Sequence, residues 1–209
     1  MDTSFSVRQI TRSSWKVLKS QIWILVGLLI GYTIISSLIS CLMPSPTEVS
    51  AMMIVSIILS LLVGIVFSLG YYQNIFQTID GEEPQFSTYA SQSKNVGKGL
   101  IAGIIFGITV GIGTTLLILP GIYLALRLQF YTTAIVEGNM GAVESLKYSW
   151  KITKGKEWYL LKVALMSLLL VLVGMLFFFV GAFVTAPLVY VMSAQVYRQL
   201  VAADGTENI

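Results

Sequence analysis

Long apolar runs separated by short polar segments dominate the sequence. A helix that crosses a membrane needs about 20 apolar residues in a row. Five runs approach or exceed this length, and they cover residues 22–43, 49–76, 99–119, 122–136 and 158–200. The fourth run is short and partly polar, whereas the fifth is long enough for two crossings joined by a tight turn near 179–181. The pattern therefore predicts six membrane-crossing helices.

The basic residues indicate how these helices are oriented. Twelve of the 13 lysines and arginines precede or open the first, third and fifth predicted crossings, or end the sixth. The opposite loops, at 44–48, 119–121 and near 179, carry none. Because cytoplasmic loops are enriched in lysine and arginine, we expect both termini in the cytoplasm. This distribution requires an even number of crossings, which supports dividing the last run in two.

The composition favours a membrane protein over a soluble enzyme. Of the 209 residues, 56% are hydrophobic and 11% are charged, whereas a soluble domain has about 25% charged residues. The chain has no histidine, and its single cysteine, Cys41, excludes an internal disulfide. It shows no nucleophile–base set, metal-ligand spacing or phosphate-binding loop. We therefore expect a protein that is not an enzyme and that holds no metal and no cofactor.

A twelve-residue motif occurs twice, each time at the foot of an apolar run. Residues 14–25 return at an offset of 135 as residues 149–160, which pairs Ser14 with Ser149 and Trp15 with Trp150. Each copy predicts a basic surface helix that carries tryptophan and leads into a membrane hairpin.

An acid followed by glycine closes each even-numbered predicted crossing, at Asp80, Glu137 and Asp204. Glycine just past a helix end adopts the left-handed conformation that terminates the helix. An acid there is unfavourable beside the negative end of the helix dipole, so we expect each acid to have a partner such as a lysine of a neighbouring surface helix. A weaker surface helix at 86–94 has Tyr89 in place of tryptophan.

These features predict an all-α integral membrane protein with six transmembrane helices. The helices form three hairpins, each preceded by a cytoplasmic amphipathic surface helix. The pseudo-repeat units cover about residues 5–81, 82–138 and 139–205 of a single membrane domain, 1–209.

The surface helices are the first candidate site. Their basic residues recur at i, i+4 and i+7, so that they share one helical face, and each set lies beside the motif tryptophan. The residues are Arg12, Lys16 and Lys19 with Trp15, and Lys147, Lys151 and Lys154 with Trp150. A helix of this kind is expected to lie in the membrane interface, with its apolar side among acyl chains and its basic residues near anionic headgroups. The alternative is that basic flanks and aromatic belts serve topology and anchoring.

Arg127 is the one basic residue outside the cytoplasmic set. Within the fourth run it has polar neighbours, among them Gln129 and Tyr131, and no acid is expected at its depth. A charge inside a membrane is a functional hypothesis by default. Arg127 therefore has two interpretations: contact with an anion or lipid phosphate in a cavity facing the outer leaflet, or snorkelling to the outer interface or bonding to carbonyls near Pro120.

Glycines recur every four residues in the third run, at Gly99, Gly103, Gly107 and Gly111. Small residues at this spacing allow two helices to approach closely. The stripe predicts tight helix packing within the chain, with a homodimer seam as the alternative.

A central segment, residues 119–127 with the sequence LPGIYLALR, carries a family resemblance. Further matching positions are Glu137-Gly138, Ala142, Ser149-Trp150 and Thr153-Lys154-Gly155. With these residues the chain resembles the membrane domain attached to some glycerophosphoryl diester phosphodiesterases, and related six-span bacterial proteins that stand alone. The resemblance implies a six-helix protein of the bacterial cytoplasmic (inner) membrane. It implies no activity, since no phosphodiesterase domain is present, and it favours a structural or ligand role for Arg127.

The leading functional hypothesis is a non-enzymatic protein that organises or handles anionic membrane lipid. One alternative is a transporter or exporter of a small anionic or amphipathic molecule, because repeats, a broken helix and an intramembrane charge are typical of transporters. Another is a membrane partner or immunity protein. Membrane lipids are thus the expected partners, with a homodimer or a second membrane protein as further options, and no nucleic acid.

Overall fold

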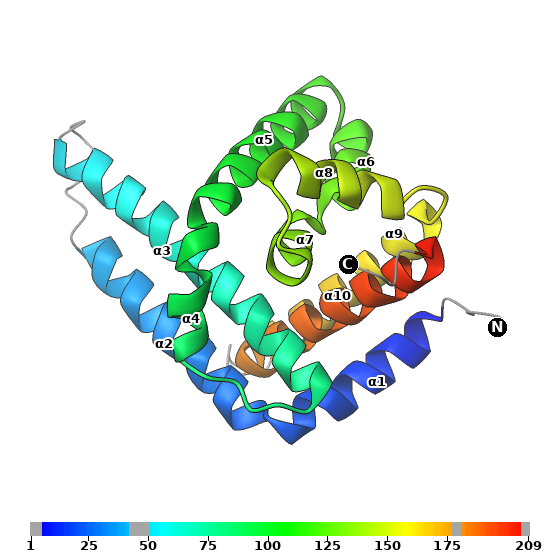
Figure 1. The fold of residues 1–209 in the computed structure, drawn as a ribbon, viewed down its shortest axis with the longest axis horizontal. Coiled ribbons are helices and arrows are strands. Elements are labelled where there is room, and N and C mark those ends of the chain that lie inside the picture. Colours follow the sequence, from blue (N-terminus) through cyan, green and yellow to red (C-terminus); the bar gives the residue numbers. More distant parts are fainter. Residues whose placement is uncertain (1–5, 42–50, 177–180, 206–209) are drawn as a thin grey trace.

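The computed structural model describes residues 6–41, 51–176 and 181–205, which form helices and turns without a β-strand (Figure 1). In chain order the elements are α1 (Val7–Ser20), α2 (Ile22–Cys41), α3 (Ala51–Asp80), α4 (Ser87–Ser91), the 3₁₀-helix η1 (Gln92–Asn95), α5 (Val96–Leu116), α6 (Ile118–Leu128), α7 (Tyr131–Gly138), α8 (Ala142–Ile152), α9 (Glu157–Leu176) and α10 (Ala182–Asp204).

Four helical segments of the described chain are long and apolar enough to cross a membrane. They are α2, α3, the continuous segment from α4 to the end of α5, and α9. Their outward faces carry large apolar side chains, such as Leu116 and Leu176, that are more than 70% exposed. Exposed leucine at this density is unfavourable in water, so the described helices suit a membrane. The four segments coincide with the first, second, third and fifth predicted crossings.

The fourth predicted crossing, 122–136, is not one continuous helix. Two short helices, α6 and α7, replace it, with a turn at Gln129 and Phe130. At this turn the Phe130 N–H donates to the Ser149 hydroxyl over 3.2 Å instead of to a helical carbonyl. The helix also begins earlier than predicted, at Ile118, because Leu117 is extended (φ −160°, ψ 140°) and reverses the chain between α5 and α6.

Helix α10 lies in the interior of the bundle. Val191, Met192 and Ala194 are fully buried on it. It has 23 residues, a sufficient length for a crossing, but Gln195 and Arg198 lower its hydropathy, and it is not among the four apolar segments. Pro187 lies inside the helix.

The connection between α9 and α10 falls largely outside the described residues, as does the predicted loop at 44–48. Of the predicted turn at 179–181, Gly181 alone is described. A Cβ atom built on Gly181 would lie 2.5 Å from the Gly174 carbonyl oxygen. The two helices therefore meet at a pair of glycines at this end, where no side chain separates their backbones.

The three amphipathic segments each pack against a helix that ends in one of the acid–glycine pairs. Figure 1 shows α1 running alongside α10 and α8 lying across α5, α6 and α7. The third segment, α4, packs on α3, where the Tyr89 ring fills the space left by Gly70. The contact between α1 and α10 joins the two ends of the described chain.

Candidate functional site: two basic helices and the ion pairs beside them

Helix α1 divides into a buried face and a charged face. Ile10, Ser14 and Leu18, spaced four residues apart, are at most 2% exposed, because residues at this spacing share one side of a helix. The basic residues all lie on exposed positions, and none forms an ion pair with a described residue. They are Arg8, Arg12, Lys16 and Lys19.

The expectation that the apolar face of this helix sinks among acyl chains is wrong. That face packs against the protein itself, chiefly α10. Trp15 is 39% exposed, and the Lys19 ammonium lies 5.6 Å from its ring centroid. The helix therefore offers its cations and part of one tryptophan to its surroundings.

Two serines fix α1 on α10. The hydroxyls of Ser13 and Ser14 both donate to the Gln195 side-chain oxygen, over 2.7 and 2.8 Å. Ser14 is fully buried, so this bond satisfies a polar group that water does not reach. The bonds set the rotation of α1 and thereby which of its residues are exposed.

Helix α8 presents its lysines in a different way. The Lys151 ammonium pairs with the Asp204 carboxylate over 2.7 Å, and this hydrogen bond raises the pKa of the lysine. Lys147 is exposed and forms no ion pair with a described residue. Lys154 is likewise exposed and without a described ion pair, but it lies in the turn after α8 ends at Ile152 and therefore does not continue the predicted helical face. The charge available on this helix is therefore smaller than the sequence pattern predicted.

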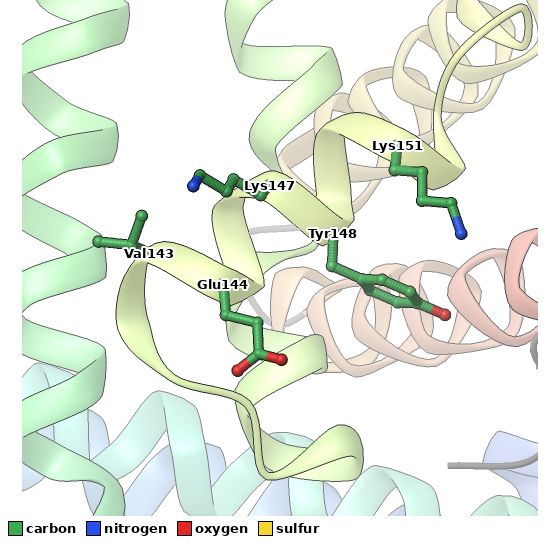
Figure 2. A pocket seen from close by; sticks show the side chains of 5 residues that line it. All are labelled: Val143, Glu144, Lys147, Tyr148 and Lys151. Carbon is green, nitrogen blue, oxygen red and sulfur yellow. The ribbon is translucent and has the colours of Figure 1, made fainter.

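An open hollow of about 450 Å³ lies along α8. Lys147, Lys151, Tyr148, Glu144 and Val143 line it (Figure 2). Figure 2 shows Tyr148 and Lys151 extending to the same side of the helix, with Lys147 on the other. Glu144 accepts a hydrogen bond from the Gly141 N–H over 3.1 Å and so caps the start of the helix. One lysine and one acid of the hollow are thus already engaged within the protein.

The two copies of the twelve-residue motif occupy closely similar environments. Side chains at matching positions have nearly equal exposure, although the two copies contact different helices. The pairs are Ser14 and Ser149 (0% and 0%), Trp15 and Trp150 (39% and 39%), Trp23 and Trp158 (86% and 77%), and Leu25 and Leu160 (0% and 1%). In each copy the serine points into the bundle and the second tryptophan points out of it.

Arg127 is held by the second copy of the motif. Its guanidinium donates to the Glu157 carboxylate over 2.5 Å and to the Trp150 carbonyl over 2.7 Å. The guanidinium carbon lies 4.2 Å from the Trp150 ring centroid and 5.8 Å from that of Tyr123. The main-chain carbonyl of Arg127 accepts hydrogen bonds from Ser149 and Thr153. Arg127 therefore joins α6 to the end of α8 and the start of α9.

Three expectations about Arg127 are wrong. An acid, Glu157, does lie at its level, and the arginine is 2% exposed instead of snorkelling. It also lies against the segment 149–157 that carries the basic residues, and not at a separate interface. The sequence missed the acid because Glu157 opens the next apolar run, 30 residues further along the chain.

The other two residues predicted beside Arg127 point elsewhere. Gln129 donates to the Leu126 carbonyl over 3.0 Å and lines a partly open cavity between α3, α9 and α10. The Tyr131 ring packs on Phe106 with a centroid distance of 5.3 Å. The predicted trio therefore does not form one site.

Arg198 is the residue that sequence reasoning missed. It donates two hydrogen bonds to Asp80, of 2.5 and 2.8 Å, and one of 2.6 Å to Glu137. One guanidinium thus joins the carboxyl-terminal ends of α3 and α7 to α10. The acid–glycine pairs were the available signal. The expected lysine partner is confirmed for Asp204, but for Asp80 and Glu137 the partner is an arginine of α10.

The glycine after each of the three acids was predicted to be left-handed and to end its helix. Two of the three glycines are left-handed. Gly81 and Gly205 have φ of 84° and 72°, values in the left-handed region that suits glycine. After α7 the left-handed residue is Asn139 (φ 48°), one position beyond Gly138.

The glycine stripe of α5 packs over half its length. Added Cβ atoms at Gly99 and Gly103 would lie 3.0 Å from Ile65 and 3.6 Å from Tyr131, whereas those at Gly107 and Gly111 would have no described neighbour within 4 Å. The closest approach to a glycine of α5 is instead at its far end, where a Cβ on Gly113 would lie 2.6 Å from the Leu124 side chain and 3.2 Å from the Gly121 Cα. The sequence pattern did not predict this contact.

The chemistry of this region is electrostatic. Across the residues that the structure describes, no group of three or more acidic, histidine or cysteine side chains could hold a metal ion. The groups that are free to act are cations on α1, on α8 and in the turn after α8. The acids Glu157, Asp204, Asp80 and Glu137 are engaged with Arg127, Lys151 and Arg198.

A family model for a domain of unknown function, DUF7847, matches residues 87–205, from α4 to the end of α10. No curated protein and no solved structure matches the chain. The matched segment contains Arg127, the second motif copy and Arg198, and it covers more than half of the chain. The chain belongs to the DUF7847 family.

Proposed function

We propose that this protein is a non-enzymatic, polytopic membrane protein that binds anionic lipid headgroups through its basic surface helices and thereby organises or handles anionic lipid. The single observation that carries the proposal is the charged face of α1. Four cations lie exposed on it without an ion pair to a described acid. Each basic residue near an anionic membrane contributes about 1 kcal/mol of binding free energy.

The way α1 is held supports a headgroup-binding role. A helix that only anchors a chain can use its apolar face for the bilayer, but Ile10 and Leu18 are already buried against the protein. The Ser14–Gln195 hydrogen bond fixes the rotation of the helix. The cations are therefore presented by a rigid element, which favours a defined binding surface.

The proposed topology has six crossings in three hairpins, each preceded by a surface helix. Besides the four long apolar segments, α10 and the broken pair α6–α7 would cross. The pairing of Arg198 with Asp80 and Glu137 supports this arrangement, since it brings the ends of α3, α7 and α10 to one level. By the positive-inside rule that level is cytoplasmic, as are both termini. A bacterial inner membrane is proposed on the family resemblance alone.

The threefold repetition belongs to the same proposal. The matched environments of the two motif copies support an equivalence of α1 and α8. The packing of α1 on α10, of α4 on α3 and of α8 on α7 follows one scheme. Under it, each surface helix packs on the closing helix of the preceding unit, and the first unit packs on the last.

A transport function has less support at Arg127. Transport at this residue would require a positive charge that is unpaired and faces a cavity. The Arg127 guanidinium is instead engaged by Glu157, by the Trp150 carbonyl and by two aromatic rings. A role as a partner or immunity protein has no specific observation in its favour.

Lipid binding to the purified protein tests the proposal. In native mass spectrometry we expect more retained phosphatidylglycerol than phosphatidylcholine at equal supply. The triple change Arg12→Gln, Lys16→Gln and Lys19→Gln should reduce this preference by roughly tenfold or more, because it removes about 3 kcal/mol of attraction. The charge-conserving triple change Arg12→Lys, Lys16→Arg and Lys19→Arg is the matched control and should retain the preference. Equal retention of the two lipids by the unaltered protein would refute the proposal.

A further inference from the structure

A partly open cavity of about 330 Å³ lies between α3, α9, α10 and the break that separates α6 from α7. Its volume falls in the range of small-molecule sites, about 300–1,000 Å³. It is separate from the basic helices, and none of the described residues that line it is charged. Its polar lining residues are Tyr72, Gln129, Ser167, Tyr190 and Ser193.

Two interruptions of helical structure adjoin this cavity. At Gln129 and Phe130 the chain turns between α6 and α7, and both residues line the cavity. On the opposite wall, Pro187 lies inside α10, two residues before the first lining residue of that helix. A proline donates no hydrogen bond and displaces the backbone of the preceding turn. Broken helices deep in a membrane protein are tolerated where they line a cavity, and in transporters they mark binding sites.

The polar groups around the cavity have unused hydrogen-bonding capacity. The Gln129 side-chain oxygen and the hydroxyls of Ser167 and Tyr190 form no hydrogen bond with a described residue, and Ser193 only accepts a long bond of 3.4 Å from Tyr72. Other serines in these helices, such as Ser56, bond to a carbonyl one turn back. These side chains are half-buried and so accessible from the cavity. In the proposed topology no bulk water pairs them within the membrane, and an unpaired polar group there is unfavourable, so they favour a polar group inside the cavity.

The depth of the cavity restricts that group to an uncharged one. Ser167 lies ten residues after the start of α9, about 15 Å along the helix at 1.5 Å per residue, which is half of a hydrocarbon core of about 30 Å. A charge there would require a counter-charge in the lining. The remaining lining side chains, such as Val163 and Leu160, are apolar.

We propose that this cavity binds an uncharged single-chain amphiphile whose hydroxyl head bonds to up to three of the polar side chains Gln129, Ser167, Tyr190 and Ser193. A hydroxyl both donates and accepts, which matches a lining made of hydroxyls and one amide. The site is independent of the lipid headgroup binding proposed for α1, because it lies in another part of the bundle and recognises no charge.

Photolabelling of the protein in lipid nanodiscs tests this site. The probe is a diazirine-bearing decanol, with peptide mass spectrometry to locate the label and unlabelled 1-decanol as competitor. We expect label on the cavity-lining parts of α9 and α10, displaced by 1-decanol but not by decanoate or decyltrimethylammonium. Ala164→Trp fills the cavity from α9 and should reduce this labelling several-fold. Leu168→Trp places the same ring one turn away on the exposed side of α9 and should leave it unchanged.

A second pair of changes tests the site even if the Ala164→Trp variant misfolds. Gln129→Leu and Ser193→Ala each remove hydrogen-bonding groups without adding much volume, and each should weaken competition by 1-decanol by roughly two- to tenfold. Labelling that is confined to outward residues such as Leu168, or that persists in Ala164→Trp, would overturn the proposal. So would equal competition by decanoate. The triple glutamine variant of α1 separates the two proposals, since it should lose anionic lipid but retain the cavity label.

Discussion

Ser14 and Ser149, 135 residues apart in the sequence, are both fully buried and both direct their hydroxyls into the bundle. Ser14 donates to the Gln195 side chain over 2.8 Å, and Ser149 donates to the Arg127 carbonyl over the same distance. The same residue type at the same motif position thus fixes two surface helices on different partners.

Loss of either hydroxyl is expected to destabilise the protein. Ser14→Ala leaves Gln195 with only the exposed Ser13 as donor, and Ser149→Ala leaves the Phe130 N–H unsatisfied. Each change should cost about 1 kcal/mol of unfolding free energy. Ser20→Ala, at an exposed position of α1, is the control and should be nearly neutral. Reversible unfolding in mixed detergent micelles measures these differences, and equal stability of all three variants would contradict the assignment.

The ion pair of Arg127 and Glu157 predicts a strongly asymmetric mutational effect. Glu157→Gln leaves the arginine buried with a weaker partner. Breaking a buried pair costs about 3–5 kcal/mol, but the Glu157 side chain is 32% exposed, so we expect about 2 kcal/mol. The double change Arg127→Met with Glu157→Gln should recover part of this loss, because no charge remains buried. Glu82→Gln, an exposed acid with no described ion pair, is the control for thermal unfolding in detergent. A double variant less stable than Glu157→Gln would argue against this account.

Arg198 should not be replaceable by lysine. Its planar guanidinium bonds to two carboxylates at once, whereas a lysine ammonium lacks this geometry. We expect Arg198→Lys to lower the unfolding free energy by about 1 kcal/mol, as a loss of one of the two acids would. Asp80→Asn and Glu137→Gln provide the comparison. Because the three side chains are between 29% and 50% exposed, rising salt should reduce the difference between the unaltered protein and these variants. Salt-independent differences would indicate a packing effect.

Two glycines of the α5–α6 hairpin should respond to alanine with opposite signs. A Cβ at Gly121 would lie 2.1 Å from the Thr114 hydroxyl oxygen and 2.7 Å from its Cα. Gly121→Ala must therefore shift backbone and should cost about 1–3 kcal/mol. Gly107→Ala meets no described neighbour within 4 Å and should stabilise the helix by up to about 1 kcal/mol. The two variants serve as controls for each other in thermal unfolding. A destabilising Gly107→Ala that also alters the oligomeric state would favour the homodimer seam.

The sequence was a good guide where local patterns decide the structure. The apolar runs predicted the four long helices, and the i, i+4, i+7 spacing placed Arg12, Lys16 and Lys19 on an exposed face. The acid–glycine pairs led to the Lys151–Asp204 contact. These features depend on length, composition and helical periodicity, which are properties of contiguous segments.

The sequence was a poor guide to Arg127 because its surroundings come from elsewhere in the chain. Glu157 and Trp150 reach it only after α8 folds back across α6. The break between α6 and α7 likewise depends on Ser149, which bonds to the Phe130 N–H from another helix.

By itself, then, the sequence determined which segments are helical, which are apolar enough for a membrane and which surfaces are basic. These properties follow from side-chain hydrophobicity and the helical repeat. Both act within one segment and do not depend on contact with another helix. The tertiary structure decided which charges remain free. It engages Arg127, Lys151 and Arg198 with acids far along the chain and leaves the cations of α1 exposed. Such pairing depends on how separate helices pack, and hydropathy does not encode it.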